Sequence, residues 1–139
     1  MTNLLIDTGA VVALLNAREP AHQPCVDFFS GFQGKIISTE SVLTESLYLL
    51  GDSLEHQKKC IEFFIQGVRI FPFSPKGLMQ CLTLMEKYQD TPMDFADATL
   101  TVVAEELTCG DIFTLDRRGF ETYRWARNRP FKIYPENRS

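Results

Sequence analysis

Residues 3–16 read NLLIDTGAVVALLN, a short apolar run, an aspartate, and a second apolar run. Residues 3–6 are typical of a buried strand, and residues 9–16 are typical of the helix that follows it. Asp7 stands at the junction, where an aspartate often caps the helix. In open parallel sheets, ligands also bind outside the carboxyl ends of the strands. Both interpretations, a cap and a site residue, stay open for Asp7.

The same order of strand and helix recurs along the chain. The apolar runs that read as strands are short and rich in branched side chains, and they do not alternate with polar residues. This pattern predicts a parallel sheet covered by helices on both faces, in a single α/β domain over residues 1–139. The predicted strands are 3–6, 35–39, 68–73, 111–115 and 131–134, and the predicted helices are 9–16, 20–32, 40–51, 54–67, 75–88, 91–110 and 117–128.

Length and composition exclude several classes of protein. The 139 residues suit one hydrophobic core, and no apolar run approaches the roughly 20 residues of a membrane span. The N-terminus shows no pattern of an export signal, so we expect a cytoplasmic protein with no membrane contact. His22 and His56 are isolated, and we interpret both as ordinary histidines. The four cysteines form no metal-binding pair, and we predict that all are free thiols: Cys25, Cys60, Cys81 and Cys109.

Charge is distributed unevenly along the chain. Residues 1–116 hold 7 basic and 16 acidic side chains, whereas residues 117–139 hold 7 basic and 2 acidic ones. A solvated terminal segment accounts for such a run. A basic rim beside an acidic site, suited to a polyanionic substrate, is the alternative, although a charge run taken alone favours the solvated segment. Under the second interpretation Arg117 and Arg118 are the candidate nucleic-acid contacts, because they follow Asp116 directly.

Two further acids stand at places where a site is possible. Asp116 follows the predicted strand 111–115 and, like Asp7, fits either a helix cap or a site residue. Glu45 lies in helix 40–51 about 40° beyond the edge of an apolar arc, so its carboxylate is expected at the rim of a buried surface. A solvated boundary position is the alternative for Glu45. The arc consists of Val42, Leu43, Leu47, Leu49 and Leu50.

The stretch TPMDFADATL, residues 91–100, holds two aspartates three positions apart. The segment from Thr91 to Asp94 has the form of a capping box, with Thr91 as the cap, a proline at the first helical position and Asp94 at the third. Helix initiation therefore explains Asp94. Asp97 then falls near the sixth helical position, beyond the reach of a cap. Its neighbours are small, and it shares a sector of roughly 80° with other polar residues of the helix. Asp97 is therefore the acid with the weakest structural explanation.

Carboxylates that converge without a basic partner repel one another, and burial raises their pKa values. A divalent cation relieves that conflict, and sites built from oxygen ligands suit Mg²⁺ or Mn²⁺. The chemistry that fits is hydrolysis of a phosphate ester by a water that a metal activates. A phosphatase with Asp7 as nucleophile is a weaker reading, because the sequence Asp7-Thr8-Gly9 has no second aspartate two residues on.

Four segments taken together resemble the acidic motifs of PIN-domain ribonucleases, and more narrowly VapC-type toxins of toxin–antitoxin pairs. They are LLIDTGAVVALLN, STESVLTESLYLL, MDFADATL and FTLDRRGF. The resemblance covers nearly the whole chain and implies a three-layer α/β/α fold around a parallel sheet of about five strands. It also implies RNA cleavage that depends on Mg²⁺ or Mn²⁺, a homodimer, and a cognate antitoxin.

By position, the resemblance assigns the four catalytic acids to Asp7, Glu45, Asp97 and Asp116, with metal ligation by Asp7, Asp97 and Asp116. Asp94, Thr8 and Thr114 match auxiliary positions. Two alternatives stay open, a catalytically silent module that binds RNA or protein and an RNA-processing nuclease without an antitoxin. The apolar side of helix 54–66 and the Phe-rich residues 28–32 fit either the core or an interface.

Overall fold

The computed structural model describes residues 2–136, and its centre is a sheet of five parallel strands in the order β3-β2-β1-β4-β7. Strand β1 lies in the middle, between β2 and β4. The chain first extends the sheet on one side through β2 and β3, and then returns to add β4 and β7 on the other. The strands are β1 (Asn3–Ile6), β2 (Lys35–Ser38), β3 (Val68–Ile70), β4 (Asp111–Phe113) and β7 (Lys132–Tyr134).

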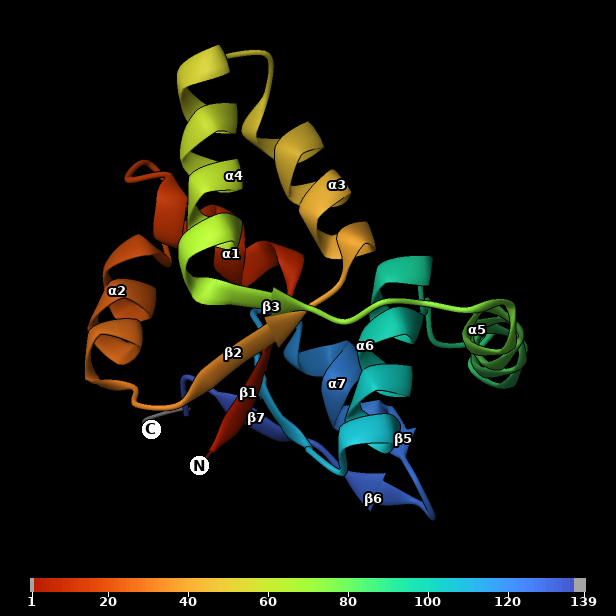
Figure 1. Cartoon of the computed structure of the whole chain (residues 1–139). Coiled ribbons are helices and arrows are strands. Elements are labelled where there is room, and N and C mark those ends of the chain that lie inside the picture. Colours follow the sequence, from red (N-terminus) through yellow and green to blue (C-terminus); the bar gives the residue numbers. More distant parts are fainter. Residues whose placement is uncertain (1, 137–139) are drawn as a thin grey trace.

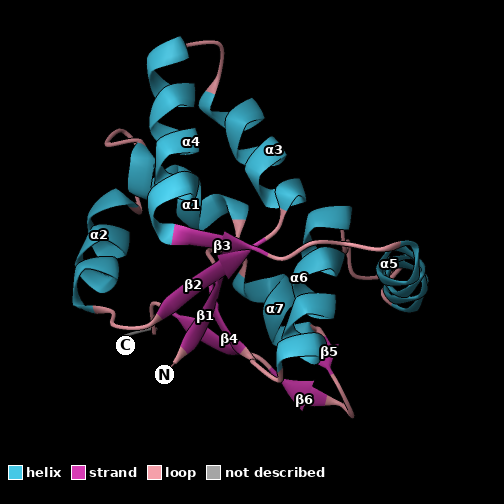
Figure 2. Cartoon of the chain, in the orientation of Figure 1, coloured by secondary structure: helices cyan, strands magenta, loops and turns pink. Residues whose placement is uncertain are grey.

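Helices cover both faces of this sheet (Figure 1). One layer contains α1, α2, α3 and α4, and the other contains α5, α6 and α7, as the secondary-structure colouring of Figure 2 makes clear. The predicted three-layer α/β/α class with a parallel five-stranded sheet is thus confirmed. The helices are α1 (Thr8–Leu15), α2 (His22–Gly31), α3 (Glu40–Leu50), α4 (Leu54–Gly67), α5 (Pro75–Lys87), α6 (Phe95–Leu107) and α7 (Arg117–Thr122).

The core follows from the composition of the central strands and of α6. Strand β1 is almost wholly buried, as expected for a parallel strand with helices on both faces. Helix α6 buries nine consecutive residues from Ala96 to Ala104, because small side chains let it pack closely against its neighbours. All four cysteines are free and buried, as predicted, and burial raises the pKa of the Cys60 and Cys81 thiols to about 11.

One predicted helix is wrong in its second half. Helix α7 ends at Thr122, and residues 124–130 form an antiparallel hairpin of β5 (Arg124–Trp125) and β6 (Arg129–Pro130). Ala126 and Asn128 adopt positive φ angles of 40° and 67°, which a helix does not allow. The indole of Trp125 packs over Gly110 and donates a hydrogen bond to the carbonyl of Pro130 at 3.0 Å. This tertiary contact favours the turn over the helix.

The core predictions for the helices are correct in part. On α3, Val42 and Leu50 are buried, but Leu49 is exposed, contrary to the predicted apolar arc. On α4, Cys60 and Phe64 are buried, whereas Ile65 is 75% exposed. One side of each of these two helices therefore packs into the core, and another side leaves apolar side chains exposed on the surface. No helix within residues 2–136 has both the length and the apolar character to cross a bilayer.

Candidate functional site

The candidate site lies outside the carboxyl ends of β1 and β4. The strand order reverses between these two neighbouring strands, and open parallel sheets bind ligands at such a switch point. Asp7 follows β1 directly, and its backbone N–H donates to the carbonyl of Phe113 at the end of β4. Its side chain is 6% exposed, and one carboxylate oxygen accepts from the Thr8 N–H at 2.8 Å. Asp7 therefore caps α1 and also faces the switch point.

Thr114 connects Asp7 to the loop that follows β4. Its hydroxyl donates to the second carboxylate oxygen of Asp7 at 2.9 Å and accepts from the backbone N–H of Asp116 at 3.0 Å. Thr114 is buried, so the two bonds hold the acid of one strand in a defined position relative to the next. Thr8, another of the three predicted auxiliary residues, has a buried hydroxyl oxygen with no hydrogen-bond partner among the residues described.

The start of α6 differs from the prediction. Asp94, and not Thr91, is the N-cap, and Asp97 occupies the third helical position. Asp94 accepts from the Asp97 N–H at 2.8 Å, and Asp97 Oδ2 accepts from the Asp94 N–H at 3.3 Å. Asp97 therefore does take part in a capping box. Its side chain is nevertheless only 7% exposed, which capping of a surface helix does not require.

Tyr123 is a member of the site that sequence reasoning missed. It is fully buried, and its hydroxyl lies 2.9 Å from the Pro92 carbonyl and 3.3 Å from Asp97 Oδ2. Asp97 Oδ2 thus faces the Asp94 N–H and the Tyr123 hydroxyl, whose single proton is shared with the nearer Pro92 carbonyl. No hydrogen bond within residues 2–136 engages Oδ1 of Asp97. Tyr123 is 26 residues from Asp97, and no local pattern around it indicates the contact.

Asp116 caps the short helix α7, since its Oδ1 accepts from the Gly119 N–H at 3.1 Å. Gly119 lies where two site groups meet. A Cβ atom there would stand 2.6 Å from Asp116 Oδ2 and 3.0 Å from the Tyr123 hydroxyl. The absence of a side chain at Gly119 is what lets the Asp116 carboxylate and Tyr123 both approach α7.

Glu45 is half-buried on α3, consistent with a place at the rim of the buried surface. The N-cap of α3 is Thr39, whose hydroxyl hydrogen-bonds the Thr99 hydroxyl of α6 at 2.9 Å. This contact fixes the start of α3 against the helix that carries Asp97. The negative charge of Glu45 contributes to the raised pKa of Asp7.

Burial and the charges of neighbouring acids raise the pKa values of two of the five candidate acids, Asp7 and Asp97. Burial raises the pKa of Asp7 from 3.8 to about 6, against the lowering effect of its bonds to Thr8 and Thr114. Burial is also the main cause that holds the pKa of Asp97 well above its usual range, followed by the charges of Asp7 and Asp94 and, more weakly, of Asp116. No lysine or arginine forms an ion pair with these acids within the described residues.

This donor set suits a divalent cation. The two buried carboxylates are hard oxygen ligands, and the buried, unpaired Thr8 hydroxyl is one more oxygen beside Asp7. In the part of the chain that the structure describes, no three His, Cys, Asp or Glu side chains are grouped so that they alone hold a metal. Mg²⁺ is usually held by one or two carboxylates, with water and substrate phosphate completing its shell. The residues fit that mode rather than a closed cage.

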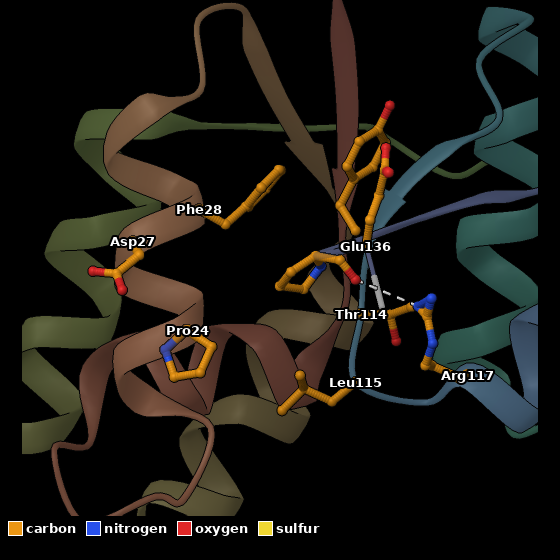
Figure 3. Close-up of a pocket in the computed structure, with 9 residues that line it drawn as sticks. Pro24, Asp27, Phe28, Thr114, Leu115, Arg117 and Glu136 are labelled. Atoms are coloured by element: carbon orange, nitrogen blue, oxygen red, sulfur yellow. Dashed lines mark hydrogen bonds between the residues drawn. The ribbon is translucent and has the colours of Figure 1, made fainter. Parts of the chain in front are cut away.

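A cavity of about 830 Å³ opens beside the acids, between α2 and the ends of β4 and β7. Thr114 lines it and separates it from Asp7. Arg117 lines it as well, and its Nη1 donates to the Pro135 carbonyl at 3.4 Å (Figure 3). Arg118 is exposed and is not among the lining residues. Among the seven basic residues of the segment 117–139, Arg138 lies outside the residues that the structure describes.

Two other cations of the basic end, Arg124 and Arg129, have structural contacts. Arg124 Nη1 donates to the carbonyls of Glu121, Thr122 and Tyr123 at 2.8–3.2 Å and so closes the end of α7. The Arg129 guanidinium lies over the Trp125 ring, 5.3 Å from its centroid. His22 Nδ1 donates to the Ala13 carbonyl at 2.7 Å, in keeping with an ordinary satisfied histidine.

Comparison with known proteins gives one matching family, described as PIN domain, over residues 4–126. Among curated proteins, the chain is 25% identical over 135 residues to Ribonuclease VapC26 of Mycobacterium tuberculosis, covering 95% of this chain and 100% of that protein. The match runs through all four acidic motifs, since these lie between residues 4 and 126.

Solved structures with the same fold include VapC20 of Mycobacterium tuberculosis, reported as a Sarcin-Ricin loop cleaving toxin. It has a TM-score of 0.74 at 18% identity and covers 78% of this chain and 86% of that one. VapBC2 from Rickettsia felis, bound to a DNA fragment from its promoter, has a TM-score of 0.68 at 14% identity and covers 96% and 99%. These similarities extend over 78% and 96% of this chain and establish the fold.

Proposed function

Because the chain belongs to the PIN-domain family, we propose that it is a metal-dependent endoribonuclease that hydrolyses RNA phosphodiester bonds. One observation carries the proposal. Asp7 and Asp97 are buried carboxylates with raised pKa values, at the switch point of the sheet and without a basic partner. Such an arrangement costs stability in a protein that does not use it, and it is typical of a catalytic site. The similarity to Ribonuclease VapC26 supports RNA as the substrate.

In this proposal the buried carboxylates of Asp7 and Asp97 hold the cation together with water and the substrate phosphate, and Asp116 and Glu45 complete the catalytic acids. When bound, Mg²⁺ or Mn²⁺ supplies a water of lowered pKa and polarises the phosphoryl oxygen. The two hydrogen bonds of the Thr114 hydroxyl hold Asp7 in a fixed position relative to the loop that carries Asp116. The Asp94 N–H and the Tyr123 hydroxyl lie at Oδ2 of Asp97, and its Oδ1 is left for the cation.

The test is cleavage of a labelled single-stranded RNA by the purified protein with Mg²⁺, with Mn²⁺ and with EDTA. Asp97→Asn keeps the size of the side chain but removes its charge, so we expect the rate to fall by about a hundredfold or more. Asp90→Asn is the matched control, because Asp90 is exposed and lies just before the α6 cap. Equal activity of the two variants, or full activity in EDTA, would refute the proposed site.

We also propose that the chain is the toxin of a toxin–antitoxin pair and acts as a homodimer. The proposal draws on relatives whose solved structures are reported as VapBC and toxin–antitoxin complexes. Exposed apolar side chains on α4 and α5, such as Ile65 and Met79, offer surface for protein partners. Expression of the wild-type chain should arrest bacterial growth, and Asp97→Asn should not. Rescue by the small protein encoded next to it would identify the antitoxin, whereas arrest by both forms would refute the toxin assignment.

A further inference from the structure

Glu45 is held differently from the other four candidate acids. Each of the others accepts at least one hydrogen bond at its carboxylate. Within residues 2–136, no hydrogen bond or ion pair engages the Glu45 carboxylate. Its charge nevertheless reaches Asp7, because it contributes to the raised pKa of that residue. The place of the Glu45 carboxylate in the site therefore depends on how helix α3 is held.

Two buried hydroxyls bond the start of α3 to α6. Thr39 is the N-cap of α3, and Thr99 lies in the second turn of α6. Both side chains are 1% exposed, and their oxygens are 2.9 Å apart. Figure 1 shows that α3 begins beside α6 and then leads away from it toward α4. The hydroxyl pair thus lies at the end of α3 where the two helices meet.

The hydrogen bond between the two hydroxyls has only one possible direction. Thr99 donates its single proton to the Ala96 carbonyl at 2.6 Å, so toward Thr39 it is an acceptor. Thr39 is therefore the donor to Thr99, and its oxygen accepts from the Val42 N–H at 3.4 Å. The bonds form one continuous series from the Val42 N–H to the Ala96 carbonyl. Each proton in the series is used once, so the arrangement has no equivalent alternative.

Ser38, the residue before Thr39, makes a second link of this kind. Its side chain is fully buried, and its hydroxyl donates to the carbonyl of Ile6 at 2.9 Å. Ile6 directly precedes Asp7. Two consecutive residues at the end of β2 therefore connect the elements that carry three of the four proposed catalytic acids. Apolar side chains could fill this space, but hydrogen bonds also fix distance and direction, which apolar contacts do not.

We propose that Thr39 and Thr99 are positioning residues of the site, and that their hydroxyl pair sets where α3 places Glu45 relative to Asp97. The inference rests on the proposed ribonuclease function. Asp97 is held within its own helix by the reciprocal cap with Asp94. Loss of the hydroxyl pair should therefore displace Glu45 and leave the two cation ligands in place. The pair then affects the rate of the bound complex, and not the binding of metal or RNA.

Thr99→Val keeps the shape of the side chain but leaves the Thr39 proton without its acceptor. We expect kcat for RNA cleavage to fall by about tenfold or more, since a misplacement of roughly 1 Å costs up to about a hundredfold. The KM for RNA and the affinity for Mn²⁺ should stay unchanged. Thr99→Ser restores the hydroxyl and should regain most of the lost kcat.

Thr101→Val is the matched control. Thr101 is also 1% exposed on α6, but its hydroxyl donates at 2.9 Å to the Asp97 carbonyl of the same helix. Its removal should change kcat by less than about twofold, because that carbonyl keeps its helical N–H donor. Equal losses of kcat in Thr99→Val and Thr101→Val would overturn the inference, and so would a Thr99→Ser protein as slow as Thr99→Val.

A double variant tests whether the pair acts through Glu45. Glu45→Gln alone removes the charge that the pair positions, and it should lower kcat. Adding Thr99→Val to Glu45→Gln should then lower kcat no further, because both changes affect the same group. Two losses that multiply would show that Thr99 acts on another part of the site. That result, or a fully active Glu45→Gln protein, would overturn the inference.

Hydrogen exchange of the Val42 amide gives a measurement that does not depend on cleavage. In Thr99→Val this amide should exchange about tenfold faster than in the wild type, the scale of one weakened hydrogen bond. In Thr101→Val it should exchange at the wild-type rate. Unchanged exchange at Val42 in Thr99→Val would overturn the inference. A wild type that cuts no RNA would refute the proposed function, and the exchange rates would then still decide whether the pair holds α3 to α6.

Discussion

Tyr123 shows at the scale of one residue how the site is held. Its hydroxyl reaches the Pro92 carbonyl before α6 and the Asp97 carboxylate within α6. Tyr88 packs against it with ring centroids 5.2 Å apart, and the Tyr88 hydroxyl accepts from the backbone N–H of Arg124. The two tyrosines are neighbours with bonded hydroxyls, but only Tyr123 contacts an acid of the site. Burial, followed by the charges of Asp97 and Asp116, raises the pKa of Tyr123, so it stays a protonated donor.

Tyr123→Phe should weaken Mn²⁺ binding by roughly tenfold or more, the scale for partners that orient a metal ligand. The measurement is titration of free Mn²⁺ by electron paramagnetic resonance. Tyr88→Phe removes a hydroxyl of equal size and should leave the Mn²⁺ affinity unchanged. At saturating Mn²⁺ the Tyr123→Phe protein should regain most of its RNA cleavage, because the acids themselves are intact. Equal Mn²⁺ affinity in both variants would show that Tyr123 has only a packing role.

At the scale of elements, the N-terminal ends of α6 and α7 carry acids that serve both as caps and as site residues. Asp94 and Asp97 cap α6 reciprocally, and Asp116 caps α7. Gly119 is the position where α7 can approach Asp116 and Tyr123, since any Cβ atom would stand 2.6 Å from an Asp116 oxygen. The geometry of the site therefore depends on one glycine in a six-residue helix.

Gly119→Ala should displace the Asp116 carboxylate or Tyr123, with a loss of about 1–3 kcal/mol in unfolding free energy from overpacking and a severalfold loss of RNA cleavage. Gly67→Ala is the control, because a Cβ atom at Gly67, the last residue of α4, would meet nothing within 4 Å. That substitution should stabilise by about 0.5 kcal/mol. Urea denaturation and a cleavage assay measure the two effects. A neutral Gly119→Ala would show that α7 moves freely relative to the acids.

At the scale of the whole molecule, the buried acids make stability depend on pH. Asp7 and Asp97 hold a proton more tightly in the folded protein than in the unfolded chain. Ionising these buried carboxylates lowers the stability of the folded protein. The loss is absent below the ordinary pKa of 3.8 and increases as pH rises. For Asp7 it is complete above the folded-state pKa of about 6. For Asp7 a shift of two units corresponds to about 3 kcal/mol.

In EDTA, we therefore expect the melting temperature to fall between about pH 4.5 and about pH 7.5 more steeply in the wild type than in Asp7→Asn. Mg²⁺ at the higher pH should raise the melting temperature of the wild type more than that of Asp7→Asn, because the cation binds only the intact site. Asp90→Asn should behave as the wild type. Parallel pH profiles of the wild type and Asp7→Asn would contradict the raised pKa of Asp7.

The sequence by itself determined the fold class, the free cysteines and the order of nearly all elements. Short apolar runs without alternation fit only a sheet buried on both faces, and β1, β2 and β4 are such runs. It also pointed to Asp7 and Asp116, because an acid that follows a strand in a parallel sheet lies at the edge where ligands bind. These features depend on local pattern and on neighbours in the chain, which a sequence displays directly.

Only the tertiary structure decided the rest. TPMD and DFAD both have the form of a capping box, and the choice between them is made by the Tyr123 hydroxyl on the Pro92 carbonyl and by burial of Met93, which keep residues 91–93 outside α6. The hairpin of residues 124–130 exists because Trp125 packs over Gly110. The cavity joins α2 to the end of β7, more than a hundred residues along the chain. Such contacts depend on which distant surfaces meet, and no local periodicity records them.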